Sequence, residues 1–142
     1  MIIVAVDFGD ARTGLAVCDK KELAVTEAGF VAAGSYKKAL AAVGERVKEL
    51  EAELLVVGNP INMDGSEGYR SAKCKAFARE LSELTGIPAE LYDERLTTVE
   101  AHKILSENNV RGKKRKTIVD TLSARLILED AIKVRRNKGI EA

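Results

Sequence analysis

Three carboxylates of the 142-residue chain stand at the ends of segments that read as regular structure. Asp7 follows the apolar run Ile2–Val6, Glu94 follows the short segment Ala89–Tyr92, and Asp120 begins the inner face of the last predicted helix. Burying a carboxylate is costly unless it is paired or binds a metal. Carboxylate oxygens are hard ligands that favour Mg²⁺ or Mn²⁺, and these ions can bridge a protein to a phosphate. The three acids therefore indicate phosphate chemistry.

The turn after Asp7 has the composition of a phosphate contact. Gly9 and Gly14 free the backbone for close approach, and Arg12 supplies a bidentate donor. The glycine spacing is not a dinucleotide fingerprint, because a strand and not a helix is predicted to follow it. No Walker loop is present either. The alternative role for Asp7 is to cap this turn, as aspartates often do.

Asp120 and the acidic pair Asp93 and Glu94 each have a structural alternative. At about 100° per residue, Asp120 shares a helix stripe with Ala124 and Ile127, a small apolar face that should pack on a sheet. The helix dipole favours an exposed Asp in a first turn, but it explains an inward-facing one poorly. Alternation along a strand puts Asp93 and Glu94 on opposite faces, so one should point toward the site while the other caps or pairs.

Basic residues are concentrated toward the C-terminus. Residues 1–102 contain 12 basic and 17 acidic side chains, a balance of −5, whereas residues 103–142 contain 11 and 5, a balance of +6. Such asymmetry is typical of a surface that binds nucleic acid.

The segment Arg111–Lys116 is predicted to be a loop that leads into Asp120. Loop cations of this kind would bind phosphates without reading a base sequence, and the alternative is a solvated linker. The residues concerned are Lys113, Lys114, Arg115 and Lys116. Arg95 likewise either neutralises its acidic neighbours or binds a phosphate.

The apolar pattern predicts three strands first, and then helices that alternate with two further strands. The strands at 2–8, 15–18 and 24–33 are joined by short connections, which implies antiparallel pairing. A 3.6-residue period then predicts a helix over 35–51, and a second helix carries Cys74, Phe77 and Leu81 on its inner side. The remaining elements are strands at 54–57 and 89–92 and helices near 99–107 and 117–136. The prediction is one α/β domain over residues 1–142, whose mixed five-stranded sheet has three antiparallel strands and then two parallel crossovers, with flanking helices.

Composition excludes several other classes. The hydrophobic share of 46% and charged share of 32% are those of a globular chain. Asp7 ends the first apolar run long before it could span a membrane or serve as a signal core. Cys18 and Cys74 stand far apart, as reduced thiols do in a reducing compartment, and His102 is the only histidine, so no zinc site is expected. We therefore expect a cytoplasmic protein with no membrane partner.

Four ordered motifs cover nearly the whole chain. They are Val6-Asp7-Phe8-Gly9 with Arg12 and Gly14, the segment Val57–Gly68, the segment Tyr92–Thr98 with Glu100-Ala101, and Lys114-Arg115-Lys116 followed by Val119-Asp120. Together they resemble the YqgF family of bacterial Holliday-junction-resolvase-like proteins, to which 5′-end processing of pre-16S ribosomal RNA is attributed. The departures are small: Tyr69 stands where the family usually has proline, and His102 and Ser123 replace alanines.

The resemblance implies a ribonuclease-H-like fold in which Asp7, Glu94 and Asp120 form an acidic site for Mg²⁺ or Mn²⁺. The implied reaction is phosphodiester hydrolysis, in which two metal ions about 3.5–4 Å apart activate the attacking water and neutralise the leaving oxygen. In this fold the strands of Asp7 and Glu94 should be two strand spacings apart, roughly 10 Å. Asp64 and Asp93 are therefore further candidates for the metal site.

Several functions remain open from the residues alone. Structured pre-ribosomal RNA and branched DNA present the same phosphates, and a resolvase acting on branched DNA would favour a homodimer with two active sites. A non-catalytic RNA-binding factor for ribosome maturation would keep the acids as structural groups. A nucleotide-binding domain of the actin or sugar-kinase kind also ends its first strand in Asp-x-Gly, but it closes two such domains over ATP. The favoured prediction is a metal-dependent nuclease.

Overall fold

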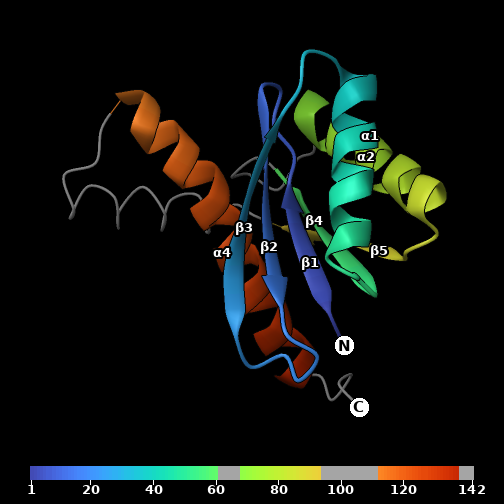
Figure 1. Cartoon of the computed structure of the whole chain (residues 1–142), viewed down its shortest axis with the longest axis vertical. Helices are drawn as coiled ribbons and strands as arrows, with labels where there is room; N and C mark the ends of the chain where they lie inside the picture. Colours follow the sequence, from blue (N-terminus) through green and yellow to red (C-terminus); the bar gives the residue numbers. More distant parts are fainter. Residues whose placement is uncertain (61–67, 94–111, 138–142) are drawn as a thin grey trace.

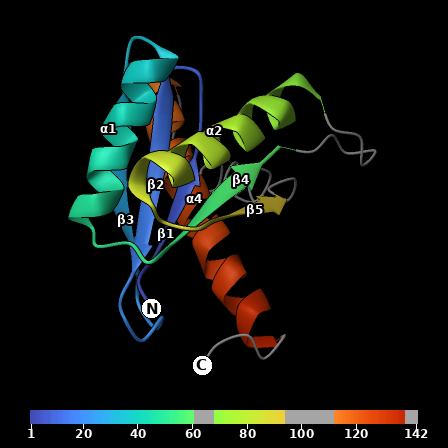
Figure 2. The same ribbon diagram turned by 90° about the vertical axis from the view of Figure 1, so that its right-hand side faces the viewer.

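The computed structural model describes residues 1–60, 68–93 and 112–137, and for residues 112–121 it describes the backbone alone. The strands are β1 (Ile3–Asp7), β2 (Arg12–Cys18), β3 (Val25–Ala32), β4 (Leu54–Asn59) and β5 (Ala89–Asp93). The helices are α1 (Tyr36–Glu49), α2 (Tyr69–Thr85) and α4 (Gly112–Asn137). Figures 1 and 2 show α1 and α2 on one side of the sheet and α4 on the other. No helix in these ranges is both long enough and apolar enough to cross a membrane.

The five strands form one mixed sheet in the order β3-β2-β1-β4-β5. The first three pair antiparallel through short turns, whereas β4 joins β1 and β5 joins β4 in parallel. The predicted mixed sheet with two parallel crossovers is therefore confirmed. The expected separation is also present, because β4 lies between β1 and β5.

The sheet carries a separate core on each face, because successive side chains of a strand point to opposite sides. Val4 and Val6 of β1 belong to the core under α1 and α2, and Ile3 and Ala5 belong to the core under α4. All four are fully buried. A central strand covered on both faces needs an unbroken apolar run, which is why the sequence 2–6 shows no alternation.

Helix ends follow the capping residues in the sequence. The Ser35 hydroxyl accepts a hydrogen bond from the Lys38 amide at the start of α1. Helix α2 ends at Gly86, whose φ of 74° is left-handed, a conformation that favours glycine. The start of α1 agrees with the expected helix over 35–51 to within one residue.

The predicted loop over Arg111–Lys116 is wrong for most of its length. Helix α4 begins at Gly112, so the four basic residues from Lys113 to Lys116 lie in its first two turns. Lysine and arginine are good helix formers and no proline interrupts the segment. Apolar periodicity was absent there because these turns do not lie over the sheet: in Figure 1 they extend past β3. The helix expected near 99–107 lies outside the described residues.

The C-terminal half of α4 is fixed to the antiparallel side of the sheet. Ala124, Ile127 and Leu128 are fully buried in the core beneath it. At its margins Arg125 forms an ion pair with Glu27 of β3, with nitrogen and oxygen 3.3 Å apart. This packing sets the rotation of α4 about its axis and hence the side of the helix that faces the sheet.

Candidate active site

Asp7 is the last residue of β1 and lies on the α4 face of the sheet. It follows Ile3 and Ala5 at two-residue intervals, and both of these belong to the core under α4. Its partner across the antiparallel ladder is Gly14 of β2, which presents no side chain beside the carboxylate. Asp7 is partly buried. The strand therefore holds one carboxylate at the carboxyl edge of the sheet, at the border between core and solvent.

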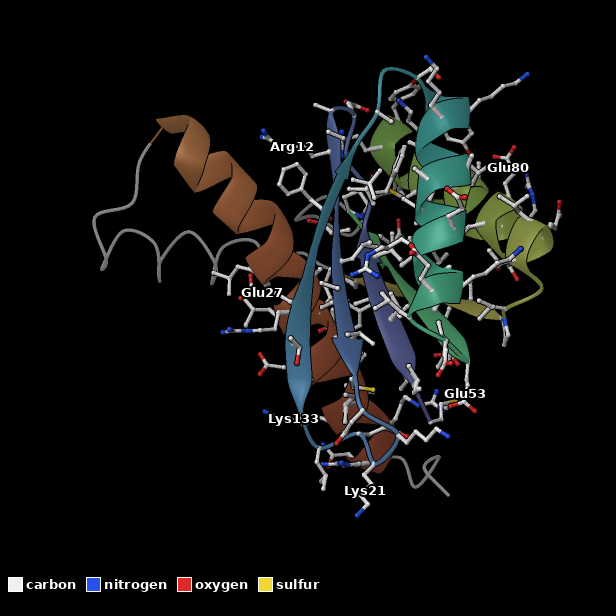
Figure 3. All side chains as sticks on the ribbon, in the orientation of Figure 1. Arg12, Lys21, Glu27, Glu53, Glu80 and Lys133 are labelled. Carbon is white, nitrogen blue, oxygen red and sulfur yellow. The ribbon has the colours of Figure 1, made fainter. Side chains whose placement is uncertain are left out.

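The turn that follows Asp7 brings Arg12 to the same face. Arg12 is the first residue of β2, and alternation through Gly14 and Ala16 puts it on the α4 side. Figure 3 shows its side chain directed to that side. Gly9 has a structural role in this turn, because a Cβ there would lie 2.4 Å from the Arg12 carbonyl oxygen. A tight turn thus links the acid to the arginine.

The end of β4 offers an amide and no acid. Asn59 is buried, and its Oδ1 accepts a hydrogen bond of 2.6 Å from the Ser71 hydroxyl of α2. Asn59 therefore belongs to the α1 and α2 side of the sheet. Its neighbour across the parallel ladder is Asp93 of β5.

The pleat of β5 directs Asp93 away from the face of Asp7. Ala89 packs against the core under α1 and α2, whereas Tyr92 packs against the core under α4 and its hydroxyl donates to Asp130. Asp93 therefore lies on the face opposite to Asp7. Glu94, Arg95 and Asp64 lie outside the described residues.

The backbone of α4 places Asp120 one turn before Ala124. Ala124, Ile127 and Ala131 share the buried side of this helix, and a residue four positions earlier lies on the same side. Because the helix begins at Gly112, Asp120 is eight residues beyond its start. The helix dipole acts within the first turn, so it does not explain an acid at this position. The side chains of Asp120 and of the four basic residues before it are among those not described.

Within the described ranges, no group of three histidine, cysteine, aspartate or glutamate side chains is arranged to hold a metal. Of the three predicted ligands, only the Asp7 side chain is described. The donor chemistry nonetheless suits a hard divalent cation, since all three ligands would be carboxylates.

A cluster that the sequence analysis missed lies where the start of α2 meets the turn after β1. The Asp10 carboxylate accepts from Arg70 Nη1 at 3.1 Å and from Lys73 Nζ at 3.0 Å, and Arg70 Nη2 donates to the Phe8 carbonyl at 3.4 Å. The hydrogen bond from Lys73, together with the Arg70 charge, lowers the pKa of Asp10 below its ordinary value, and the same contact raises the pKa of Lys73. The two cations stand three residues apart, and the sequence shows that this spacing puts them on one helix face. The sequence does not show that Asp10 is their partner.

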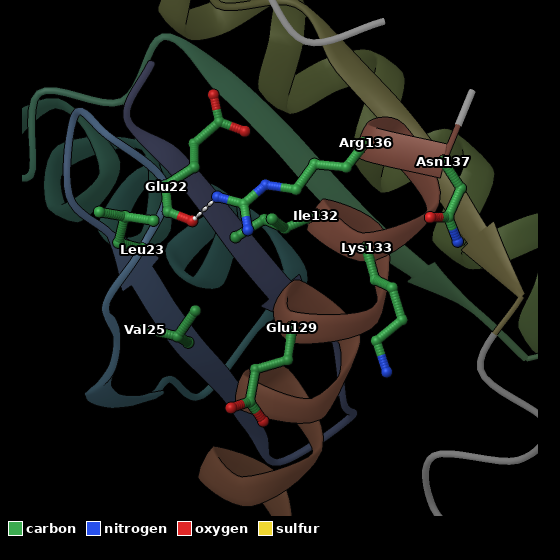
Figure 4. Close-up of a pocket in the computed structure, with 8 residues that line it drawn as sticks. All are labelled: Glu22, Leu23, Val25, Glu129, Ile132, Lys133, Arg136 and Asn137. Atoms are coloured by element: carbon green, nitrogen blue, oxygen red, sulfur yellow. Dashed lines mark hydrogen bonds between the residues drawn. The ribbon is translucent and has the colours of Figure 1, made fainter. Parts of the chain in front are cut away.

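The cavity in Figure 4 lies away from this edge. It encloses about 260 Å³ between α4 and the loop before β3, and it is lined by Glu22, Leu23 and Arg136 among others. Arg136 Nη2 donates to the Glu22 carbonyl there at 2.6 Å. Val25 at its rim pairs with Cys18, at the far end of β2 from Gly14. This cavity therefore lies at the opposite end of β2 from Gly14, the ladder partner of Asp7.

Comparison with known proteins decides the family. A family described as "RuvX: Holliday junction resolvase", the YqgF family under another name, matches residues 1–134. The chain belongs to the RuvX family. Relatives bearing the name "Putative pre-16S rRNA nuclease" include one from Syntrophus aciditrophicus, 38% identical over 91% of this chain and 86% of its own length. Another, from Thermoanaerobacter pseudethanolicus, is 35% identical over 97% of this chain and 100% of its own.

Solved structures confirm the ribonuclease-H-like fold of this RuvX-family chain. RuvC of T. thermophilus in complex with a Holliday junction substrate superposes with a TM-score of 0.60 at 15% identity, covering 96% of each chain. The fowlpox virus resolvase bound to Holliday junction DNA gives 0.55 at 13% identity, covering 93% of this chain and 99% of its own. The family match and the relatives' names support a nuclease role, and hence hydrolysis of phosphodiester bonds.

Proposed function

We propose that this RuvX-family chain is one nuclease domain over residues 1–142 that hydrolyses phosphodiester bonds in structured nucleic acid. We assign the ligands of Mg²⁺ or Mn²⁺ to Asp7, Glu94 and Asp120. The observation that supports this most is the place of Asp7, which ends a strand buried on both faces and lies on the α4 side of the sheet. Asp120 belongs to α4, one helix turn before the buried Ala124. Glu94 follows Tyr92 by two residues, and strand alternation would put it on that same side.

The residues of the chain would divide the work as follows. The carboxylates of Asp7, Glu94 and Asp120 would hold the divalent ions, whose chemistry is to lower the pKa of the attacking water and to neutralise the leaving oxygen. Arg12 would orient a non-bridging phosphate oxygen through its guanidinium, because the tight turn keeps it on the face of Asp7. Arg95 and the basic residues Lys113, Lys114, Arg115 and Lys116 would bind phosphates of the flanking strand.

For the substrate we propose the 5′ leader of precursor 16S ribosomal RNA, in agreement with the names of the relatives. Such a role belongs to ribosome maturation in the cytoplasm. The second candidate is a four-way DNA junction, which the family description and the RuvC likeness favour. A junction is cut on two strands, so that candidate also calls for a homodimer with two sites.

The deciding experiment compares cleavage of a precursor 16S leader and a four-way DNA junction side by side, with Mg²⁺ or Mn²⁺ and with EDTA. Asp7→Asn should abolish metal-dependent cutting of whichever substrate is used. Asp19→Asn is the matched control, because Asp19 is exposed in the turn after β2 and its Oδ1, which an asparagine would retain, accepts from the Leu23 amide at 2.8 Å.

The outcome separates the candidate functions. Cutting that survives in Asp19→Asn but not in Asp7→Asn supports the carboxylate nuclease, and the preferred substrate decides between RNA and junction. Binding of both nucleic acids without cleavage under any metal condition would replace the nuclease by a non-catalytic RNA-binding factor.

A further inference from the structure

Tyr69 presents an aromatic ring to solvent at the first residue of α2. Its side chain is 80% exposed, more than any other large hydrophobic residue of the described ranges. Lys73 Nζ lies 5.9 Å from the centre of this ring and 5.9 Å from the centre of the Phe8 ring. The ammonium group therefore holds the Tyr69 ring by a cation–π contact while leaving most of the ring uncovered.

The first turns of α2 also carry two cations that contact the turn after β1. Arg70 contacts the carbonyl of Phe8, the residue that follows Asp7, and shares Asp10 with Lys73. Two positive charges face one negative charge here, so the cluster has a surplus of positive charge. The side chains of Arg70 and Asp10 are 49% and 66% exposed, and ion pairs as exposed as this contribute little to stability.

These features have a poor explanation in folding alone. An aromatic residue that served the core would be covered, as Phe8 and Phe77 are, stacked with ring centres 4.2 Å apart. An open ring flanked by cations is instead the arrangement with which proteins bind single-stranded nucleic acid, by stacking on a base and pairing with its phosphate.

We propose that Tyr69, Arg70 and Lys73 form a binding site for an unpaired nucleotide at the edge of the sheet where β1 ends in Asp7. Tyr69 stacks on the base, and Arg70 and Lys73 bind the adjoining phosphate. Asp10 holds the two cations in position when no nucleic acid is bound. The inference rests on the proposed nuclease function and deepens it, because it states which part of the substrate is recognised: a segment whose bases are not paired.

The test measures binding of a fluorescein-labelled twelve-nucleotide uridine RNA, by fluorescence anisotropy and without divalent metal so that nothing is cut. A blunt twelve-base-pair RNA duplex is the comparison. Tyr69→Ala should weaken binding of the single strand roughly tenfold or more, since stacking on one base is lost. Tyr69→Phe should keep wild-type affinity, and the duplex should be bound equally by the wild type and both Tyr69 variants.

Two further sets of variants test the cations and the specificity of the effect. Leu23→Ala removes a side chain that is 71% exposed at the far end of the sheet, and it should change nothing. Arg70→Gln and Lys73→Gln should each reduce the slope of log affinity against log salt by roughly 0.7 for a single strand. Asp10→Asn should tighten binding, because it removes the acid nearest to the phosphate.

Thermal unfolding establishes whether each variant is folded. If Lys73→Gln does not fold, Lys73→Arg replaces it as a variant that keeps the positive charge. The inference is overturned if the wild type and Tyr69→Ala bind the uridine RNA equally well. That result would leave cleavage and its dependence on Asp7 intact. An equal loss in Tyr69→Phe and Tyr69→Ala would also overturn it, because the hydroxyl and not the ring would then be responsible. The proposed function fails on a separate result, namely that the wild-type protein shows no cleavage that depends on Asp7.

Discussion

Replacing Gly9 by alanine should damage both the stability and the activity of the protein. A Cβ at Gly9 would lie 2.4 Å from the Arg12 carbonyl oxygen, whereas ordinary contact begins at 3.4 Å, so the turn must open by about 1 Å. The obstacle is backbone and cannot rotate away. Overpacking of this kind costs about 1–3 kcal/mol of the free energy of unfolding, which lowers the Tm of a chain this long by roughly 2–12 °C.

Activity should fall further than stability. The turn connects Asp7 to Arg12, and a displacement of about 1 Å in a catalytic group can reduce the rate roughly 100-fold. The assay is therefore Tm by thermal unfolding together with the cleavage rate, measured at a temperature where the variant is fully folded.

Gly34→Ala is the matched control. A Cβ at Gly34 meets nothing within 4 Å, and the alanine restricts the unfolded chain, so stability should be unchanged or rise by up to about 1 kcal/mol. The reasoning is refuted if Gly9→Ala retains the Tm and cleavage rate of the wild type, or if Gly34→Ala loses as much as Gly9→Ala does.

Three other predictions concern single contacts. Ser71→Ala should cost about 1–3 kcal/mol in urea unfolding, because it removes the hydroxyl that donates to buried Asn59; a loss below 0.5 kcal/mol would mean that another donor replaces it. Lys73 and Arg70 lower the pKa of Asp10, so this carboxylate stabilises the fold above its unfolded pKa and loses that contribution as pH falls through the lower, folded value. The stability difference between wild type and Asp10→Asn should therefore be small but present at pH 7 and vanish in acid, and a difference independent of pH would contradict the ion pairs. Burial raises the pKa of the Cys18 thiol, so alkylation followed by mass spectrometry at pH 8 should be slow in the native protein and fast in urea, and equal rates would show that the thiol is accessible.

Much of the fold could be predicted because local composition and packing agree. The run 2–6 is apolar throughout because β1 is covered on both faces, and Gly86 ends α2 because its φ is positive. Short connections between 2 and 33 allow only antiparallel pairing, so the β1-β2-β3 meander was predictable too. The start of α4 was not predictable. An amphipathic helix is indicated in sequence by an apolar stripe, but the first turns of α4 are basic and extend past β3.

The candidate site was predictable only in part. Alternation placed Asp93 and Glu94 on opposite faces, and the structure assigns Asp93 to the side away from Asp7. The Asp10 cluster could not be predicted, since Arg70 meets Asp10 across 60 residues of sequence and the contact depends on how α2 crosses the sheet. The roles of Glu94 and Asp120 as ligands stay predictions for the metal-dependent cleavage assay.

The packing of α4 has a consequence for when the enzyme becomes active during its synthesis. One face of the sheet is completed only by residues 124–132, although that face is laid down from Ile3 onward. A chain emerging from the ribosome can pair β1 with β2, β3 and β4 early, but its α4-side core stays uncovered until the last helix is released. The proposed acidic site has one ligand at residue 7 and another at residue 120, so it too would be assembled last. A nuclease built in this order would complete its proposed metal site only after α4 has left the ribosome.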